Sequence, residues 1–125
     1  MDTEQKNVTY DSTTEIIVLS TLEELSLETM SKAINQIMEL SATHNCESVL
    51  IDITNTKSFP PTFDMYSFGE ELIHTLGIQK LRFAFALSDD IFDTFKLFND
   101  VFADRGLYFQ IFKDLDEAKD WLLKK

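Results

Sequence analysis

The chain has 125 residues, of which 44% are hydrophobic and 26% are charged, and these values fit one domain with one sizeable core. Its formal net charge of −11 disfavours binding to nucleic-acid backbones and to anionic membrane surfaces, whereas a basic protein partner would suit it. Cys46 is the only cysteine, which excludes a disulfide within the chain and a cysteine-rich metal site. We expect Cys46 to be a small buried residue near the start of a strand.

The first ten residues, MDTEQKNVTY, lack the basic and apolar regions of a signal peptide. No apolar run in the sequence reaches the length that spans a membrane. We therefore expect a soluble cytoplasmic protein in which residues 1–125 form a single domain, with disorder, if any, in the first few residues.

Strand patterns and helix patterns alternate along the chain. In chain order, the predicted elements are strands at 7–10 and 15–20, a helix at 26–45, a strand at 48–53, a helix at 63–77, a strand at 80–87, a helix at 88–106, a strand at 107–112 and a helix at 114–125. This β-β-α-β-α-β-α-β-α order predicts an α/β fold with right-handed crossovers and a mostly parallel sheet. The short connection between the first two strands predicts that this pair is antiparallel.

The helix predicted at 26–45 has one apolar face. Four residues lie on that face at helical spacing: Met30, Ile34, Ile37 and Met38. Ser26, just before them, is the expected N-cap because its hydroxyl can accept from the free N–H groups of the first turn.

The strand at 48–53 contains Asp52 within an otherwise apolar run, which is typical of a strand covered on both faces. A carboxyl group there needs a hydrogen-bond partner, so we expect Asp52 to anchor the next loop rather than to act as a catalytic acid. That loop, TNTKSFPPT, follows the carboxyl end of the strand, where ligands of parallel α/β sheets usually bind. Its hydroxyl groups also suit a turn, and Thr62 suits a helix N-cap.

The strand at 80–87 has two unlike faces. Its large side chains share one face: Leu81, Phe83, Phe85 and Leu87. The other face carries Ala84 and Ala86, which are small enough to let a helix approach closely. Ser88 or Asp89 is expected to cap the next helix, whose first turn is acidic, as the helix dipole prefers.

The helix at 88–106 has an apolar arc that is wider than one sheet contact requires. Its expected core stripe consists of Ile91, Phe95, Phe98 and Phe102. Phe92 lies to one side of this stripe, and Leu97 and Val101 lie to the other. These three residues are candidates for an apolar ligand site or a subunit interface, as in a homodimer, although the eleven phenylalanines of the chain also fit an ordinary aromatic core.

The last predicted helix, at 114–125, has signals at both ends. Asp114 and Glu117 have the spacing of a capping box, and two lysines lie at the carboxyl end, where the helix dipole favours them.

Patterns typical of enzymes are missing from the sequence. There is no glycine-rich phosphate loop and no Gly-x-Ser-x-Gly elbow. Glu70, Glu71 and His74 have helical spacing, but a second set of metal ligands is not visible, so a solvated helix face explains them. The acids at the start of the helix at 88–106 fit its dipole. We therefore expect no enzymatic activity, no metal and no cofactor.

Three stretches carry a family resemblance: VLIDITNTKSFPPTFDMYSFGEEL, KLRFAFALSDDIFDTF and YFQIFKDLDEAKDWL. Together with the leading strands, they make nearly the whole chain resemble the STAS-type superfamily, whose type member is the sporulation anti-anti-sigma factor. The chain is more similar still to the SpoIIAA-like family, which is also grouped with CRAL-TRIO-type lipid-binding domains. The resemblance implies a single STAS-like domain that regulates or binds another protein.

The resemblance also bears on Thr62. In anti-anti-sigma factors, a partner kinase phosphorylates a serine within an Asp-Ser-Ser-Gly motif at the start of the helix after this strand. Thr62 occupies the place of that serine, but Pro60 and Pro61 replace the residues before it, so the motif is absent. Thr62 is therefore a candidate phosphoacceptor and, on its own chemistry, a helix cap.

Our leading hypothesis is a non-enzymatic regulatory or protein-interaction module with an unidentified protein partner. The candidate partner surface, at the carboxyl edge of the sheet, consists of Ser58, Phe59, Thr62, Phe63, Tyr66 and Ser67. The alternative is a carrier or sensor of a small apolar ligand such as a fatty acid or lipid. It rests on the aromatic excess and on the family's grouping with lipid-binding domains.

Overall fold

A computed structural model describes residues 8–20, 27–54, 81–103 and 109–124, together with Ser67, Glu70 and His74. Its elements are β1 (Val8–Asp11), β2 (Ile16–Leu19), α1 (Leu27–His44), β3 (Ser48–Ile53), β4 (Arg82–Leu87), α3 (Asp89–Ala103), β5 (Phe109–Phe112) and α4 (Leu115–Leu123). Each of these elements was predicted from the sequence to within a few residues. The helix predicted at 63–77 falls mostly outside the described residues, although Ser67, Glu70 and His74 are helical.

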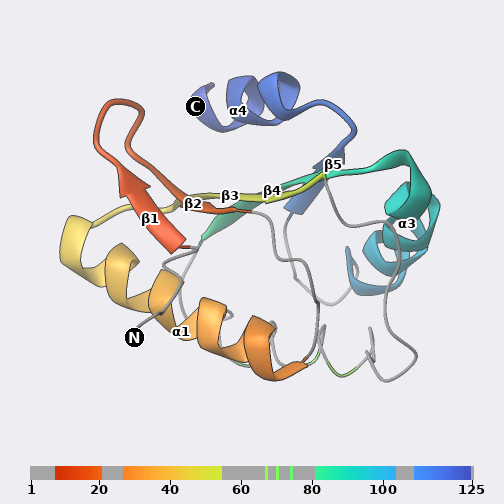
Figure 1. Ribbon diagram of the computed structural model, residues 1–125, viewed down its shortest axis with the longest axis horizontal. Coiled ribbons are helices and arrows are strands. Elements are labelled where there is room, and N and C mark those ends of the chain that lie inside the picture. The colour runs from red at the N-terminus through yellow and green to blue at the C-terminus, as the bar shows by residue number, and fades with distance from the viewer. Residues whose placement is uncertain are drawn as a thin grey trace, which may run out of the picture.

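The five strands form one sheet in the order β1-β2-β3-β4-β5. β1 pairs antiparallel with β2, and the other neighbours are parallel, which confirms the predicted mostly parallel α/β sheet. When strand order follows the chain, right-handed crossovers place their helices on one face. Figure 1 shows α1 and α3 together below the sheet. α4 follows the last strand, is not a crossover, and covers the opposite face.

The face toward α1 and α3 holds the larger apolar cluster. The members that β4 contributes are those predicted to share one face: Leu81, just before the strand, and Phe83, Phe85 and Leu87. From α1 come the predicted Ile34 and Ile37, and the Phe95 ring of α3 lies 5.2 Å from the Phe85 ring. The side chains of Met30, Phe98 and Phe102 lie outside the described part. For the side chains that the structure describes, the period-two and helical patterns therefore located this core correctly.

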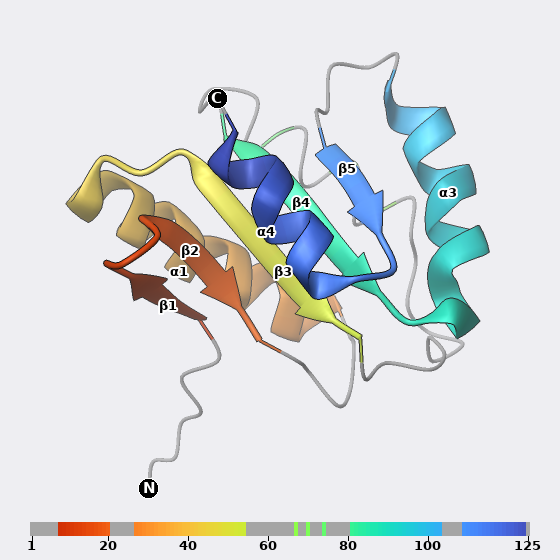
Figure 2. The ribbon, with the colours of Figure 1, turned by 90° about the horizontal axis from the view of Figure 1, so that it is seen from above.

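The face toward α4 is built from small residues. Ala84 and Ala86 of β4 are fully buried against Ala118 and Leu122 of α4. Seen from above in Figure 2, α4 lies over β3 and β4. The predicted close approach of a helix to the alanine face is therefore confirmed.

The ends of α4 differ from the prediction. Asp114 is the N-cap residue, but its side chain makes no capping hydrogen bond, so the predicted capping box is wrong in that respect. At the other end, the guanidinium of Arg82 donates to the carbonyls of Trp121 at 3.0 Å and Leu122 at 3.1 Å. The cationic group that bonds to these free carbonyls is thus supplied by β4, about forty residues away in sequence, rather than by the lysines that follow the helix.

None of the helices within the described residues is both long enough and apolar enough to cross a membrane.

Candidate functional site

The loop after β3 begins as predicted. The carboxylate Oδ1 of half-buried Asp52 accepts hydrogen bonds from the Thr54 hydroxyl at 2.8 Å and from the Thr54 N–H at 3.2 Å. These bonds anchor the start of the loop, so the structural interpretation of Asp52 is confirmed.

Most of the candidate partner surface lies outside the described residues, and this applies to Ser58, Phe59, Thr62, Phe63 and Tyr66. The remaining member, Ser67, is helical and exposed. The proposed roles of these residues, including phosphorylation of Thr62, remain predictions.

The apolar candidates on α3 lie in different surroundings. Phe92 is half-buried against the larger cluster, with the Lys113 ammonium nitrogen 4.9 Å from the centre of its ring. Leu97 is 68% exposed. Val101 lies in α3, but its side chain is outside the described part. Leu97 is thus available to a partner, whereas Phe92 already contributes to the core.

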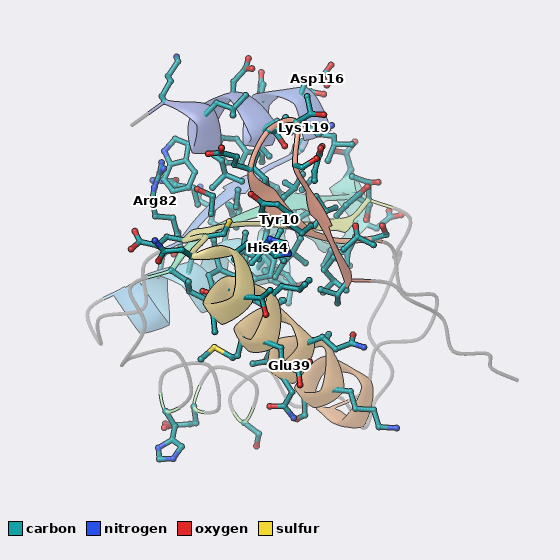
Figure 3. All side chains as sticks on the ribbon, turned by 90° about the vertical axis from the view of Figure 1, so that its left-hand side faces the viewer. Tyr10, Glu39, His44, Arg82, Asp116 and Lys119 are labelled. Atoms are coloured by element: carbon teal, nitrogen blue, oxygen red, sulfur yellow. The ribbon has the colours of Figure 1, made fainter. Side chains whose placement is uncertain are left out.

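A pocket of about 250 Å³ opens at the amino edge of the parallel strands. It lies opposite the carboxyl edge at which the sequence predicted a site. Its lining comes from β1, the β1–β2 turn, the end of α1 and the starts of β3 and β4: Tyr10, Glu15, His44, Asn45, Cys46, Glu47, Ser48 and Arg82. Figure 3 shows Tyr10 and His44 side by side at the end of α1, with Glu39 farther along the helix.

Cys46 forms part of the pocket wall and is 7% exposed, which confirms the predicted burial near a strand start. Its sulfur lies 3.2 Å from the Glu15 carbonyl oxygen and 3.5 Å from the Ser48 carbonyl oxygen, to which the S–H can donate. Cys46 therefore links the hairpin turn to β3.

Two non-glycine residues in the pocket have positive φ. Asn45, at φ 54°, follows the end of α1, and the Cys46 N–H closes the helix by donating to the Ser41 carbonyl at 3.1 Å. This is the Schellman arrangement, in which asparagine is well tolerated. Glu15, at φ 60°, ends the hairpin turn, and its N–H donates to the Asp11 carbonyl at 2.7 Å. A glutamate there costs about 1–2 kcal/mol relative to ordinary backbone.

The aromatic part of the wall is a stack of two rings. The Tyr10 and His44 rings have centroids 3.8 Å apart and planes inclined by 6°. Burial raises the pKa of the Tyr10 phenol, and the negative charge of Glu15 raises it further, with smaller contributions from Cys46 and Asp11.

The charged side chains that line the pocket differ in whether they have bonding partners. Glu15 and Glu47 are exposed, and neither forms an ion pair with another described residue. The Arg82 guanidinium is directed at the carbonyls of α4 and lies 4.5 Å from the centre of the Trp121 ring. Among the described lining residues, the pocket thus presents carboxylates, aromatic rings and one guanidinium whose N–H groups are bonded to α4.

No group of three or more His, Cys, Asp or Glu side chains gathers into a metal site within the described part of the chain. Glu70 and His74, which the sequence analysis considered as metal ligands, are helical and exposed.

No protein-family model, curated protein or solved structure matches the chain. The resemblance to the SpoIIAA-like family therefore stays a prediction. The pocket itself escaped the sequence reasoning because its walls join residues 30 or more positions apart, such as Tyr10 with His44 and Glu15 with Cys46. Asn45, the last residue of the helix predicted at 26–45, was the one local signal, and it indicated only a helix end.

Proposed function

We propose that the protein is a cytoplasmic, non-enzymatic regulatory module that binds another protein through a STAS-type, SpoIIAA-like domain. The observation that carries this proposal is that three side chains with reactive or charged groups form bonds within the fold. The Cys46 thiol faces two backbone carbonyls, the Asp52 carboxylate holds Thr54, and the Arg82 guanidinium closes α4. Each of these three described side chains stabilises the fold, which supports a function carried by surfaces.

Charge and topology support this proposal further. A net charge of −11 favours a partner with a basic surface and speeds its approach. The described part of the chain forms a mostly parallel α/β sheet, and the candidate partner surface follows β3 in the sequence.

The alternative, a carrier of a fatty acid or other apolar ligand, requires an apolar cavity. The pocket at the amino edge is lined largely by polar and charged side chains, including Glu15, Asn45 and Glu47. This pocket, the one given by the described residues, does not support that alternative, which we keep as the second proposal.

The test has two steps. The immobilised protein first captures partners from native extract of its source, and the captured protein is then purified and mixed with the free chain. We expect native mass spectrometry to detect a stoichiometric complex that is lost in the Phe63→Ala, Tyr66→Ala double variant. Leu123→Ala, which removes an exposed apolar side chain on α4, is the matched control for loss of apolar surface.

Two outcomes would contradict the proposal. One is the failure of any captured protein to form a stoichiometric complex with the free chain. The other is a small-molecule mass that accompanies the native protein and disappears on denaturation, because this would favour the carrier alternative. A phosphate-sized mass that survives denaturation would instead support phosphorylation, with Thr62 as the first residue to substitute.

A further inference from the structure

We propose that the pocket at the amino edge binds the guanidinium group of an arginine side chain from the protein partner, with Glu15 and Glu47 as its carboxylates and His44, stacked on Tyr10, as its flat wall. This inference rests on the proposed interaction function, but it concerns a surface other than the one that follows β3.

The size of the pocket suits one side chain. Its volume of about 250 Å³ lies below the roughly 300–1,000 Å³ typical of sites for whole small molecules. The lining comes from several separate segments, so the pocket is a product of the tertiary fold rather than of a single loop.

The charge of the pocket suits a cation. Glu15 and Glu47 both line it, and neither is paired with a described residue. The raised pKa of Tyr10 reflects burial first and then the charge of Glu15, which places that carboxylate close enough to act on the phenol. Arg82 also lines the pocket and keeps its positive charge, but its N–H groups are bonded to carbonyls of α4 and the two carboxylates outnumber it.

The shape of the wall suits a planar cation. One face of the His44 ring lies against Tyr10 at 3.8 Å, and His44 is exposed and lines the pocket. Guanidinium groups stack on flat rings and pair with carboxylates through two parallel N–H···O bonds, whereas an ammonium group does neither. The expected ligand is therefore arginine rather than lysine.

The backbone of Glu15 is a separate reason to connect this residue with binding. At φ 60°, glycine would suit the turn better than glutamate. Residues in such conformations are found preferentially at ligand sites, and here the side chain lines the pocket. The turn thus carries a carboxylate at a position where the backbone conformation alone would favour glycine.

The experiment titrates the full-length, ¹⁵N-labelled chain with N-acetyl-arginine amide near pH 8, at which histidine imidazoles are neutral. We expect saturating shifts of the backbone amides of Tyr10, Glu15 and residues 45–48, with a dissociation constant of about 1 mM, as suits one side chain. N-acetyl-citrulline amide has nearly the same shape without the charge and is expected to cause no saturating shifts. N-acetyl-lysine amide is expected to bind at least several-fold more weakly than the arginine probe.

Matched variants locate the binding. Glu15→Gln and Glu47→Gln are each expected to weaken arginine binding by about fivefold to tenfold, since each removes one charge-assisted contact. Glu39→Gln removes the same charge from an exposed position of α1 outside the pocket and is expected to leave binding unchanged. Glu15→Gly removes the carboxylate while suiting the turn, so it should weaken binding in a chain that is at least as stable to heat.

Several results would overturn the inference: equal binding of the citrulline probe, shifts spread over the acidic surface, or equal losses from Glu39→Gln and Glu15→Gln. Tighter binding of free arginine than of its capped form would assign the pocket to a metabolite instead of a protein. Because the purified chain is titrated without a partner, failure here leaves the capture experiment unaffected, and failure of the capture leaves this result standing.

Discussion

The two faces of the sheet are packed by opposite means. Toward α1 and α3, large side chains such as Phe85 and Phe95 fill a thick layer. Toward α4, Ala84 and Ala86 meet Ala118, and the helix lies close to the strands. In a thick layer, removal of side-chain volume lowers the stability most, whereas in a thin layer added side-chain volume does so. The same strand, β4, serves both faces because successive side chains point to opposite sides.

The largest expected effect is on the thick face. Phe85→Ala should lower the free energy of unfolding by about 3–5 kcal/mol, because it leaves a cavity beside Phe95 that the packed surroundings cannot fill. Urea denaturation measures the loss. Phe85→Leu keeps most of the volume and should lose less than half as much; equal losses from both substitutions would show that volume does not determine the stability of this face.

The next effect is on the thin face. Ala86→Leu should lower the free energy of unfolding by about 1–3 kcal/mol by forcing α4 away from β4. Thermal and urea unfolding measure the change. Ala42→Leu, the same substitution at an exposed position of α1, is the control and should be nearly neutral. A stable Ala86→Leu protein would contradict the close approach of α4.

A smaller effect is expected at the connection between β4 and α4. Arg82→Met should cost about 1.5 kcal/mol, at the low end for hydrogen bonds from a charged group because Arg82 is half-exposed. Amide hydrogen exchange should become faster in α4 while that of α1 is unchanged. Lys96→Met removes an exposed positive charge from α3 and should alter neither helix. Uniformly faster exchange would mean that Arg82 supports the whole fold rather than α4.

The smallest effect concerns the edge of the sheet, where the β1–β2 hairpin meets α4 through charge. The pKa of Asp11 is lowered chiefly by the hydrogen bond from the Thr13 N–H, at 2.9 Å, and then by hydrogen bonds from Thr14; partial burial opposes this, and Lys119 of α4 adds the smallest lowering. A lowered folded-state pKa gives stability that is present above the unfolded-state value of about 3.8 and is lost as the pH falls through the folded-state value.

Asp11→Asn should therefore be slightly less stable than wild type at neutral pH, and the difference should vanish at acid pH below the folded-state pKa. Urea denaturation across that range measures it. A difference that persists at low pH would show that the loss comes from geometry in the turn rather than from the ionised carboxylate.

Prediction from the sequence succeeded where neighbouring residues carry the information. The alternation in β4 predicted both of its faces, and the apolar run around Asp52 predicted a buried strand with an anchored loop. The capping box at Asp114 was wrong because correct spacing permits a side-chain bond without requiring it. For the candidate partner surface, residues 55–66 lie outside the described part, so that site stays a prediction.

The sequence by itself determined the element order, the mostly parallel pairing and the small-residue face, since these follow from period, spacing and connection length. Only the tertiary structure decided that Arg82 closes α4, that Tyr10 stacks on His44, and that a carboxylate-lined pocket opens at the amino edge of the sheet. Each of these contacts joins residues more than thirty positions apart. Their proximity depends on how strands and helices are arranged in space, and no local pattern encodes it.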